Sequence, residues 1–169
     1  INCYARASSN FGNYGGTFDV VGGSLTLINS TVTESVSYVG GIGILSDSAI
    51  VKMEHSVFTK SRASYGAGFW MTGESSLSMT DCIHRDAAAS IYLPYMYVDQ
   101  SSTVTAVRNL FQDLRTPTIG PVYLRGSTGY FEDCDFIDNP NDGTGGTVFL
   151  RPGSSLVITN SRFVGSSAG

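Results

Sequence analysis

A repeat is the feature that most constrains the fold of this chain. An eight-residue pattern, LTLINSTV in its first copy, recurs so that successive copies end 26, 26, 27, 25 and 27 residues apart. The copies occupy residues 25–32, 51–58, 77–84, 104–111, 129–136 and 156–163. Six copies at nearly constant spacing are typical of a solenoid, in which each repeat is one structural unit that packs against the next.

Each copy follows a second alternating segment, which usually opens with glycine. These segments are 16–21, 41–46, 67–72, 94–98, 120–125 and 146–151. Both kinds of segment alternate apolar and polar residues with a period of two, and short turns rich in Gly and Ser separate them. This pattern indicates strands and not helices. Strands this short are stable only when they pair with their copies in the repeats above and below.

The sequence therefore predicts an all-β fold, a right-handed parallel β-helix (solenoid) with about six coils of about 26 residues each. The right hand follows from the general bias of parallel crossover connections. The composition agrees, because only 14% of the residues are charged and 20 of the 169 are Gly. We expect residues 1–169 to form a single domain. Because the chain begins at Ile1, inside a repeat, we also expect it to be a segment of a longer chain or assembly.

Charge and hydropathy bear on the possible partners and location. The 10 basic residues are scattered and the net charge is −4, which argues against a nucleic-acid partner. No stretch approaches the roughly 20 apolar residues of a membrane-spanning helix. The sequon formed by Asn29, Ser30 and Thr31 makes Asn29 a candidate for N-glycosylation and is compatible with a secreted protein.

Equivalent residues of successive coils should stack in columns with a spacing of about 4.8 Å. One outward column is aromatic in four consecutive coils. It contains Trp70, Tyr97, Tyr123 and Phe149, with Tyr95 one position over. Three interpretations stay open. The rings stabilise the sheet by stacking or lie under a loop, they bind a partner protein, or they form a platform for sugar rings.

Charged residues in two further places are candidates for binding. Arg125 and Arg151 lie beside the aromatic column, where they could bind an acidic sugar or line a turn. Another column, at the turn after the eight-residue pattern, contains Asp86, Asp113 and Asp138. Stacked carboxylates could bind Ca²⁺ or serve as the acid and base of a carbohydrate-active enzyme. The alternative is a solvated acidic edge, because Asp is common in turns for backbone reasons.

The cysteines and one histidine are expected to be structural. Cys3, Cys82 and Cys134 fall in one column. Cys82 and Cys134 are two coils apart, roughly 9.6 Å, which exceeds the roughly 7 Å limit between the Cα atoms of a disulfide. We therefore expect three free thiols. His84 takes the place that Phe holds in several other copies, so we expect it to pack in the core.

Short motifs in the turns carry a family resemblance. The segments GGTF at 15–18, GGI at 40–42, GGTV at 145–148 and FIDN at 136–139 resemble the GGA-[ILVY] and FxxN repeats of polymorphic outer-membrane-protein passenger domains. More loosely, the whole chain resembles the pectin-lyase-like right-handed parallel β-helix superfamily. The resemblance implies the β-helix fold and an extracellular or cell-surface adhesive setting.

Two functions remain as hypotheses. In the first, the chain is a non-catalytic structural or adhesive module that presents flat faces to a partner protein in a larger assembly or filament. Its uncapped ends would meet further β-helix coils, because open coils expose unpaired backbone groups. In the second, it is a carbohydrate-binding or carbohydrate-active β-helix similar to a polysaccharide lyase, hydrolase or epimerase. The turns are short except around 99–102 and 140–144, which disfavours an enzyme with a walled cleft.

Overall fold

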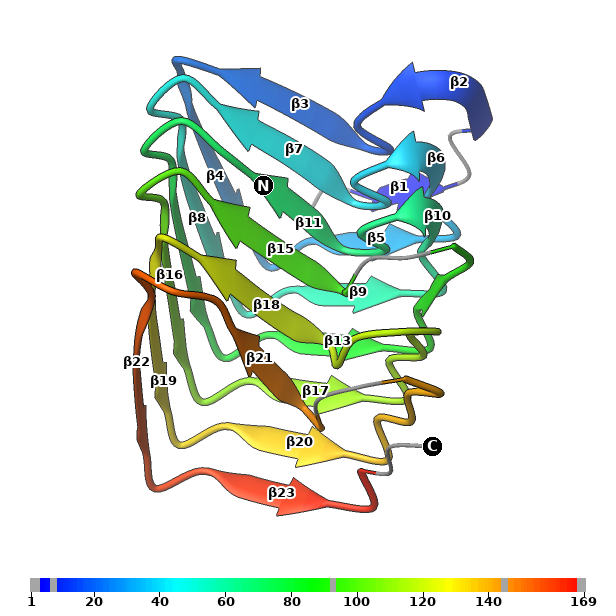
Figure 1. The fold of residues 1–169 in the computed structure, drawn as a ribbon. Coiled ribbons are helices and arrows are strands. Elements are labelled where there is room, and N and C mark those ends of the chain that lie inside the picture. The colour runs from blue at the N-terminus through cyan, green and yellow to red at the C-terminus, as the bar shows by residue number, and fades with distance from the viewer. Residues whose placement is uncertain (1–3, 7–8, 92–93, 144–145, 167–169) are drawn as a thin grey trace.

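The computed structural model describes residues 4–6, 9–91, 94–143 and 146–166. These residues form 23 β-strands in four parallel sheets, wound as a solenoid (Figure 1). The prediction of an all-β parallel β-helix with about six coils is confirmed. No helix among the described residues is long and apolar enough to cross a membrane.

The four sheets are named A to D. Sheet A contains β1 (Tyr4–Arg6), β5 (Thr31–Thr33), β9 (Val57–Thr59), β13 (Ile83–Arg85), β17 (Leu110–Gln112), β20 (Asp135–Ile137) and β23 (Arg162–Val164). Sheet B contains β2 (Ser9–Tyr14), β6 (Val36–Val39), β10 (Arg62–Tyr65) and β14 (Ala88–Ala89). Sheet C contains β3 (Phe18–Val21), β7 (Gly43–Ser46), β11 (Phe69–Met71), β15 (Met96–Asp99), β18 (Val122–Arg125) and β21 (Val148–Leu150). Sheet D contains β4 (Ser24–Ile28), β8 (Ile50–Glu54), β12 (Ser76–Thr80), β16 (Thr103–Val107), β19 (Thr128–Glu132) and β22 (Ser155–Thr159).

The first four coils pass through sheets B, C, D and A in that order, and in the described residues the last two coils have strands in sheets C, D and A alone. Each strand pairs in parallel with its copy in the next coil. The observed registers match the columns expected from the repeat. In sheet C, for example, Trp70 pairs with Tyr97 and Tyr97 pairs with Tyr123. The spacing of the repeat therefore fixed both the strands and their alignment.

Two stacks of residues with positive φ make the tight turns on either side of sheet A. The stack between sheets D and A has φ angles of 48° to 54° and consists of Asn29, His55, Asp81, Arg108, Asp133 and Asn160. The stack after sheet A has φ angles of 49° to 65° and consists of Glu34, Lys60, Asp86, Asp113, Asp138 and Gly165. Asn, Asp and Gly adopt this left-handed conformation at the lowest cost. The column of acidic residues is therefore explained by turn geometry.

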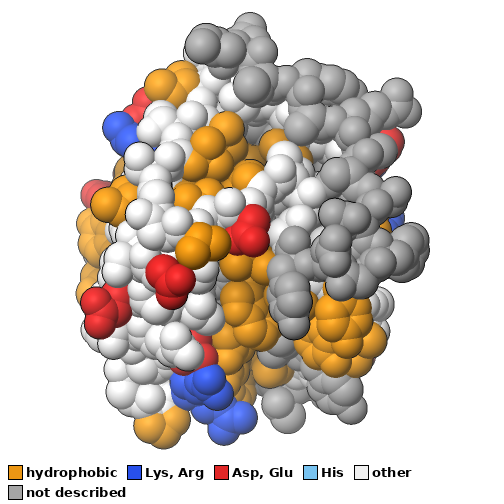
Figure 2. Space-filling model, turned by 90° about the horizontal axis from the view of Figure 1, so that it is seen from above, with side chains coloured by type: hydrophobic (Ala, Val, Ile, Leu, Met, Phe, Trp, Pro, Cys, Tyr) orange, Lys and Arg blue, Asp and Glu red, His pale blue; other side chains and the backbone are white. Residues whose placement is uncertain are grey.

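The interior is a continuous apolar core. Figure 2 shows hydrophobic side chains in the middle of the end face that is seen from above. Polar side chains at its corners satisfy backbone groups of neighbouring coils. The side-chain oxygen of Asn139 accepts a hydrogen bond from the amide of Leu114, and its side-chain nitrogen donates to the carbonyl of Phe111, both at 2.9 Å. This amide, the last residue of the FIDN motif, thus links two coils. Cys82 and Cys134 are buried free thiols, as expected, and Cys3 lies outside the described residues.

Tyr95 is a correction to the sequence analysis, which placed it beside the outer aromatic column. It is 1% exposed, and its hydroxyl lies 2.9 Å from Nδ1 of His84 in the core. The ring fits because Gly68 has no side chain: a Cβ there would lie 2.5 Å from Cζ of Tyr95. The segment before β15 lacks the glycine that opens the equivalent segments, and the large ring turns inward over Gly68.

Candidate functional site

The outer aromatic column forms a stack of rings. Ring centroids are separated by 4.2 Å between Trp70 and Tyr97, 5.2 Å between Tyr97 and Tyr123, and 5.7 Å between Tyr123 and Phe149. Because each ring covers the faces of its neighbours, Tyr97 is only 7% exposed and Tyr123 only 6%. The middle of this column offers little surface to a partner or a sugar.

Hydrogen bonds further engage this column. The hydroxyl of Tyr97 donates to Asp99 at 3.0 Å, and Arg125 donates to both carboxylate oxygens of Asp99. Burial would raise the pKa of Asp99, but the bonds from Arg125, the backbone amide of Gln100 and Tyr97 together hold it below its usual value. Burial and the Asp99 carboxylate raise the pKa of Tyr97 to about 12. The guanidinium group of Arg125 is therefore bound within the fold, where it stabilises the aromatic column.

Arg151 is also engaged within the molecule. Its Nε donates to the hydroxyl of Tyr123 at 3.2 Å, and its guanidinium carbon lies 5.3 Å from the ring centroid of Phe149. The two arginines that the sequence analysis offered for an acidic sugar therefore both make contacts inside the aromatic column.

The three aspartates proposed for calcium lie on successive coils, in the left-handed turns after sheet A. Within the described residues, no group of three or more His, Cys, Asp or Glu side chains is placed to hold a metal ion. Asp86 instead lies 3.9 Å from Nε of Arg85 and 3.5 Å from the hydroxyl of Thr59. The arrangement does not favour a calcium site.

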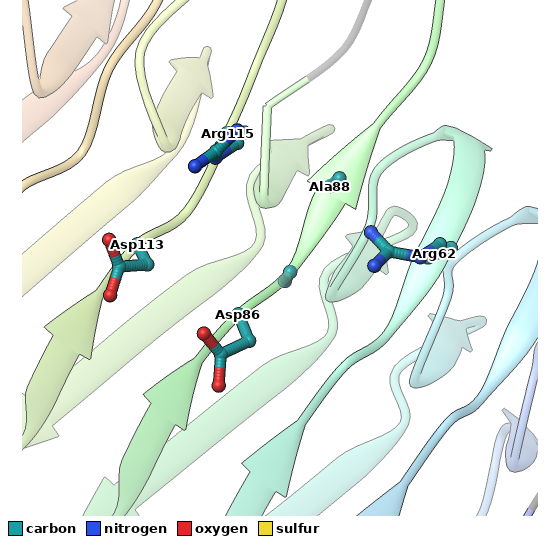
Figure 3. Close-up of a pocket in the computed structure, with 6 residues that line it drawn as sticks. Arg62, Asp86, Ala88, Asp113 and Arg115 are labelled. Carbon is teal, nitrogen blue, oxygen red and sulfur yellow. The ribbon is translucent and has the colours of Figure 1, made fainter.

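Two of these aspartates contribute to a surface depression of about 420 Å³ at the corner between sheets A and B. Figure 3 shows Arg62 and Arg115 on either side of Ala88, with Asp86 and Asp113 alongside. Arg62, Ala88 and Arg115 occupy one column in three consecutive coils. The small alanine thus leaves a gap between two guanidinium groups, bordered by two carboxylates.

The charged side chains of this depression are available to a ligand. Among the described residues, Arg62, Asp113 and Arg115 have no ion-pair or side-chain hydrogen-bond partner. Both arginines are exposed, while Asp113 is partly buried. A guanidinium donates up to five hydrogen bonds and a carboxylate accepts several. The depression therefore presents donors and acceptors side by side.

Two further depressions extend the first into a groove along the coil axis. One of about 400 Å³ shares Arg115 and is also lined by Thr116 and Asp142. The other, of about 380 Å³, shares Arg62 and Ala88 and reaches Val36. The line from Val36 to the coil after Arg115 crosses four coil spacings, about 19 Å. We call this surface the sheet B groove.

Two residues at opposite ends of the sheet B groove offer further groups for contact with a ligand. Tyr38 lies two residues after Val36 in β6, and therefore on the same outer face. It is 45% exposed, and its ring packs edge-on against Tyr65 with the centroids 5.2 Å apart. At the other end, the buried hydroxyl of Thr116 has no hydrogen-bond partner.

Sequence reasoning found the two aspartates of the groove but missed its arginines and Tyr38. The available signal was the column that reads Val36, Arg62, Ala88 and Arg115, in which two long cations flank a small residue. This column falls four residues after the end of each copy of the repeat pattern, outside the segments whose columns were compared. Asn29, the proposed glycosylation site, lies exposed in the turn between β4 and β5.

One comparison with known proteins is informative. A family model described as a right-handed β-helix region matches residues 17–169. The chain belongs to this family. No curated protein and no solved structure matches the chain. Membership of the right-handed β-helix family agrees with the resemblance to the pectin-lyase-like superfamily and gives the hand of the coil.

Proposed function

We propose that this right-handed β-helix is a non-catalytic, extracellular adhesive module that binds an extended polysaccharide along the sheet B groove. The observation that carries this proposal is the pair of exposed, unpaired guanidinium groups of Arg62 and Arg115 on either side of Ala88. The outer aromatic column, for which the sequence left a partner surface as one of three interpretations, exposes little of its middle rings because they stack on one another.

The shape and chemistry of the groove support a polysaccharide as the ligand. The groove is open to solvent and its central depression is lined mainly by charged side chains, whereas sites for drug-like molecules are usually concave and apolar. Its charged groups recur along the coil axis, which suits an extended polymer. Arginine pairs well with carboxylate or sulfate groups, and aspartate accepts hydrogen bonds from sugar hydroxyls. The exposed ring of Tyr38 can stack on a sugar face.

Binding is favoured over catalysis because the carboxylates of the groove are not enclosed. Asp86 is exposed and Asp113 is only partly buried. A carboxyl group that acts as a general acid near neutral pH usually has its pKa raised by burial or by a neighbouring charge. The site supplies complementary contacts along a polymer, and a module that binds without cleaving is suited to adhesion.

The proposal is tested by measuring polysaccharide binding with the double variant Arg62→Ala/Arg115→Ala. Polygalacturonate, heparin and dextran represent carboxylated, sulfated and neutral polymers, and isothermal titration calorimetry measures each affinity. A charge-assisted hydrogen bond is worth about 1.5–3 kcal/mol, so we expect the double variant to bind the preferred polymer at least about 100-fold more weakly.

The control variant is Lys52→Ala, which removes one positive charge from the outer face of sheet D. It should leave binding within about twofold, because Lys52 pairs with Glu54 on its own strand and lies away from the groove. Circular dichroism checks that all variants keep the fold. The proposal would be contradicted if wild type bound none of the three polymers. It would also be contradicted if Lys52→Ala weakened binding as much as the double variant does.

A further inference from the structure

The two arginines of the sheet B groove are separated by a gap of one coil. Arg62, Ala88 and Arg115 occupy equivalent positions in three consecutive coils. The two arginines therefore belong to coils about 9.6 Å apart, and the coil between them presents only a methyl group at this position (Figure 3). A ligand that runs along the groove meets a cation, then a small apolar group, then a second cation.

The coil between the two arginines carries a negative charge at the edge of the depression. Asp86 is exposed and lies two residues before Ala88. Its contacts with Arg85, at 3.9 Å, and with the hydroxyl of Thr59, at 3.5 Å, are both made by Oδ2. Among the described residues Oδ1 has no such contact, so it is available to accept a hydrogen bond from a ligand. This coil therefore suits a group that donates hydrogen bonds and carries no negative charge.

We infer that the ligand of the sheet B groove is a polysaccharide in which acidic sugars alternate with uncharged ones. This inference rests on the proposed function and specifies its ligand. In an extended chain each pyranose ring advances by about one coil spacing, so consecutive rings face consecutive coils. An alternating polymer then places its acidic groups at Arg62 and Arg115. The uncharged ring between them lies over the methyl group of Ala88 and donates a hydroxyl hydrogen bond to Asp86.

The charge balance of the depression disfavours other polymers. Arg62 and Arg115 supply two positive charges, and Asp86 and Asp113 supply two negative charges. A polymer with an acidic group on every ring would place one of these groups beside Asp86, where no arginine of the groove faces it and the like charges repel. A neutral polymer would leave both guanidinium groups without an anionic partner and would forgo their charge-assisted hydrogen bonds.

The test compares oligosaccharides of equal length by isothermal titration calorimetry. The hyaluronan hexasaccharide alternates glucuronate with N-acetylglucosamine, whereas the galacturonate hexasaccharide carries a carboxylate on every ring. We expect both to bind, and the hyaluronan fragment to bind at least about tenfold more tightly, because it places no carboxylate beside Asp86. The hyaluronan disaccharide has one carboxylate and the tetrasaccharide has two, so the affinity should rise at least about tenfold between them.

Two variants change the middle coil and leave both arginines in place. Asp86→Asn removes the negative charge, and Asn readily adopts the left-handed conformation of this turn. Ala88→Arg places a third cation in the gap between the two arginines. Each variant should raise the affinity for the galacturonate fragment at least about fivefold and so reduce the preference for hyaluronan. Circular dichroism checks that each variant keeps the fold.

The matched control is Asp138→Asn, because Asp138 occupies the same column of turns and lines none of the three depressions. It should leave the preference unchanged. Equal affinity for the two hexasaccharides, or a preference that survives both middle-coil variants, would overturn the inference. The proposed function would still stand in that case if Arg62→Ala/Arg115→Ala abolished binding. If no hexasaccharide and no polymer bound to wild type, the proposed function would fail as well.

Discussion

His84 should make the stability of this protein unusually sensitive to acid. Its imidazole is stacked between Phe58 and Phe111, with ring centroids 5.0 and 4.9 Å away. Nδ1 bonds the hydroxyl of Tyr95, while Nε2 is buried without a hydrogen-bond partner. Burial lowers the pKa of His84 from 6.5 to about 3. The native state therefore keeps this side chain neutral where the unfolded chain takes up a proton.

The sign and the size of the effect follow from this difference. Between pH 6.5 and about 3 the unfolded state binds one more proton than the native state at this residue. Its stabilising contribution is therefore complete above pH 6.5 and declines as the pH falls. At about 1.4 kcal/mol per pKa unit, the difference between 6.5 and about 3 amounts to about 5 kcal/mol at most. At pH 5 the loss should be about 2 kcal/mol.

The perturbation is the double variant His84→Phe/Tyr95→Phe. Phenylalanine at position 84 continues the ring column of Phe58 and Phe111, and the second change avoids a stranded tyrosine hydroxyl. Urea unfolding, followed by circular dichroism from pH 7.5 to 4.5, gives the free energy of unfolding of each variant. Near neutral pH the double variant should match or exceed wild type, since an unsatisfied buried group costs about 1–3 kcal/mol.

Below pH 6.5 the two curves should diverge, with the double variant losing about 2 kcal/mol less by pH 5. Carboxylates titrate in both proteins, so their contribution cancels in the difference. The single variant Tyr95→Phe is the control: it keeps the buried imidazole and should remain as acid-sensitive as wild type. Parallel curves for wild type and the double variant would refute the reasoning.

Two other substitutions test particular contacts. Asp99→Asn removes the charge that binds Arg125 and Tyr97, and should lower the free energy of unfolding by about 1.5–3 kcal/mol. When the urea titration is repeated below the pKa of Asp99, the difference in stability between wild type and this variant should disappear. Gly68→Ala places a Cβ 2.5 Å from the ring of Tyr95 and should cost about 1–3 kcal/mol. In a Tyr95→Ala background the same substitution should cost little, and an undiminished cost there would show that the ring is not responsible.

The architecture was predictable from the sequence because the repeat determines it. Every coil must pair with the next, so spacing alone gives the strand registers, such as Phe69 with Met96 and Met96 with Val122. The free thiols of Cys82 and Cys134 followed from the same columns. Local rules and the global fold agree in such a chain.

The solvent exposure of a side chain was harder to predict from the sequence than whether it points inward or outward. Alternation correctly directs Tyr97 and Tyr123 outward, but stacked rings in adjacent coils shield one another. Outward and accessible are therefore different properties wherever large planar side chains repeat at the coil spacing. Tyr95 was misplaced for another reason: its burial depends on the absence of a side chain at Gly68, in the coil before. A single repeat considered alone does not contain that information.

The candidate site depends on irregularity within the repeat. In a regular solenoid each column tends toward one residue type, because equivalent positions have equivalent surroundings. The column of Arg62, Ala88 and Arg115 departs from this, and so leaves a gap between two cations that no internal contact neutralises. By contrast, Asp99 and Arg125 alternate in sign and neutralise one another within the fold. Columns of paired charges stabilise the coil, whereas the column with unpaired charges beside a small residue is where we propose that this β-helix binds a ligand.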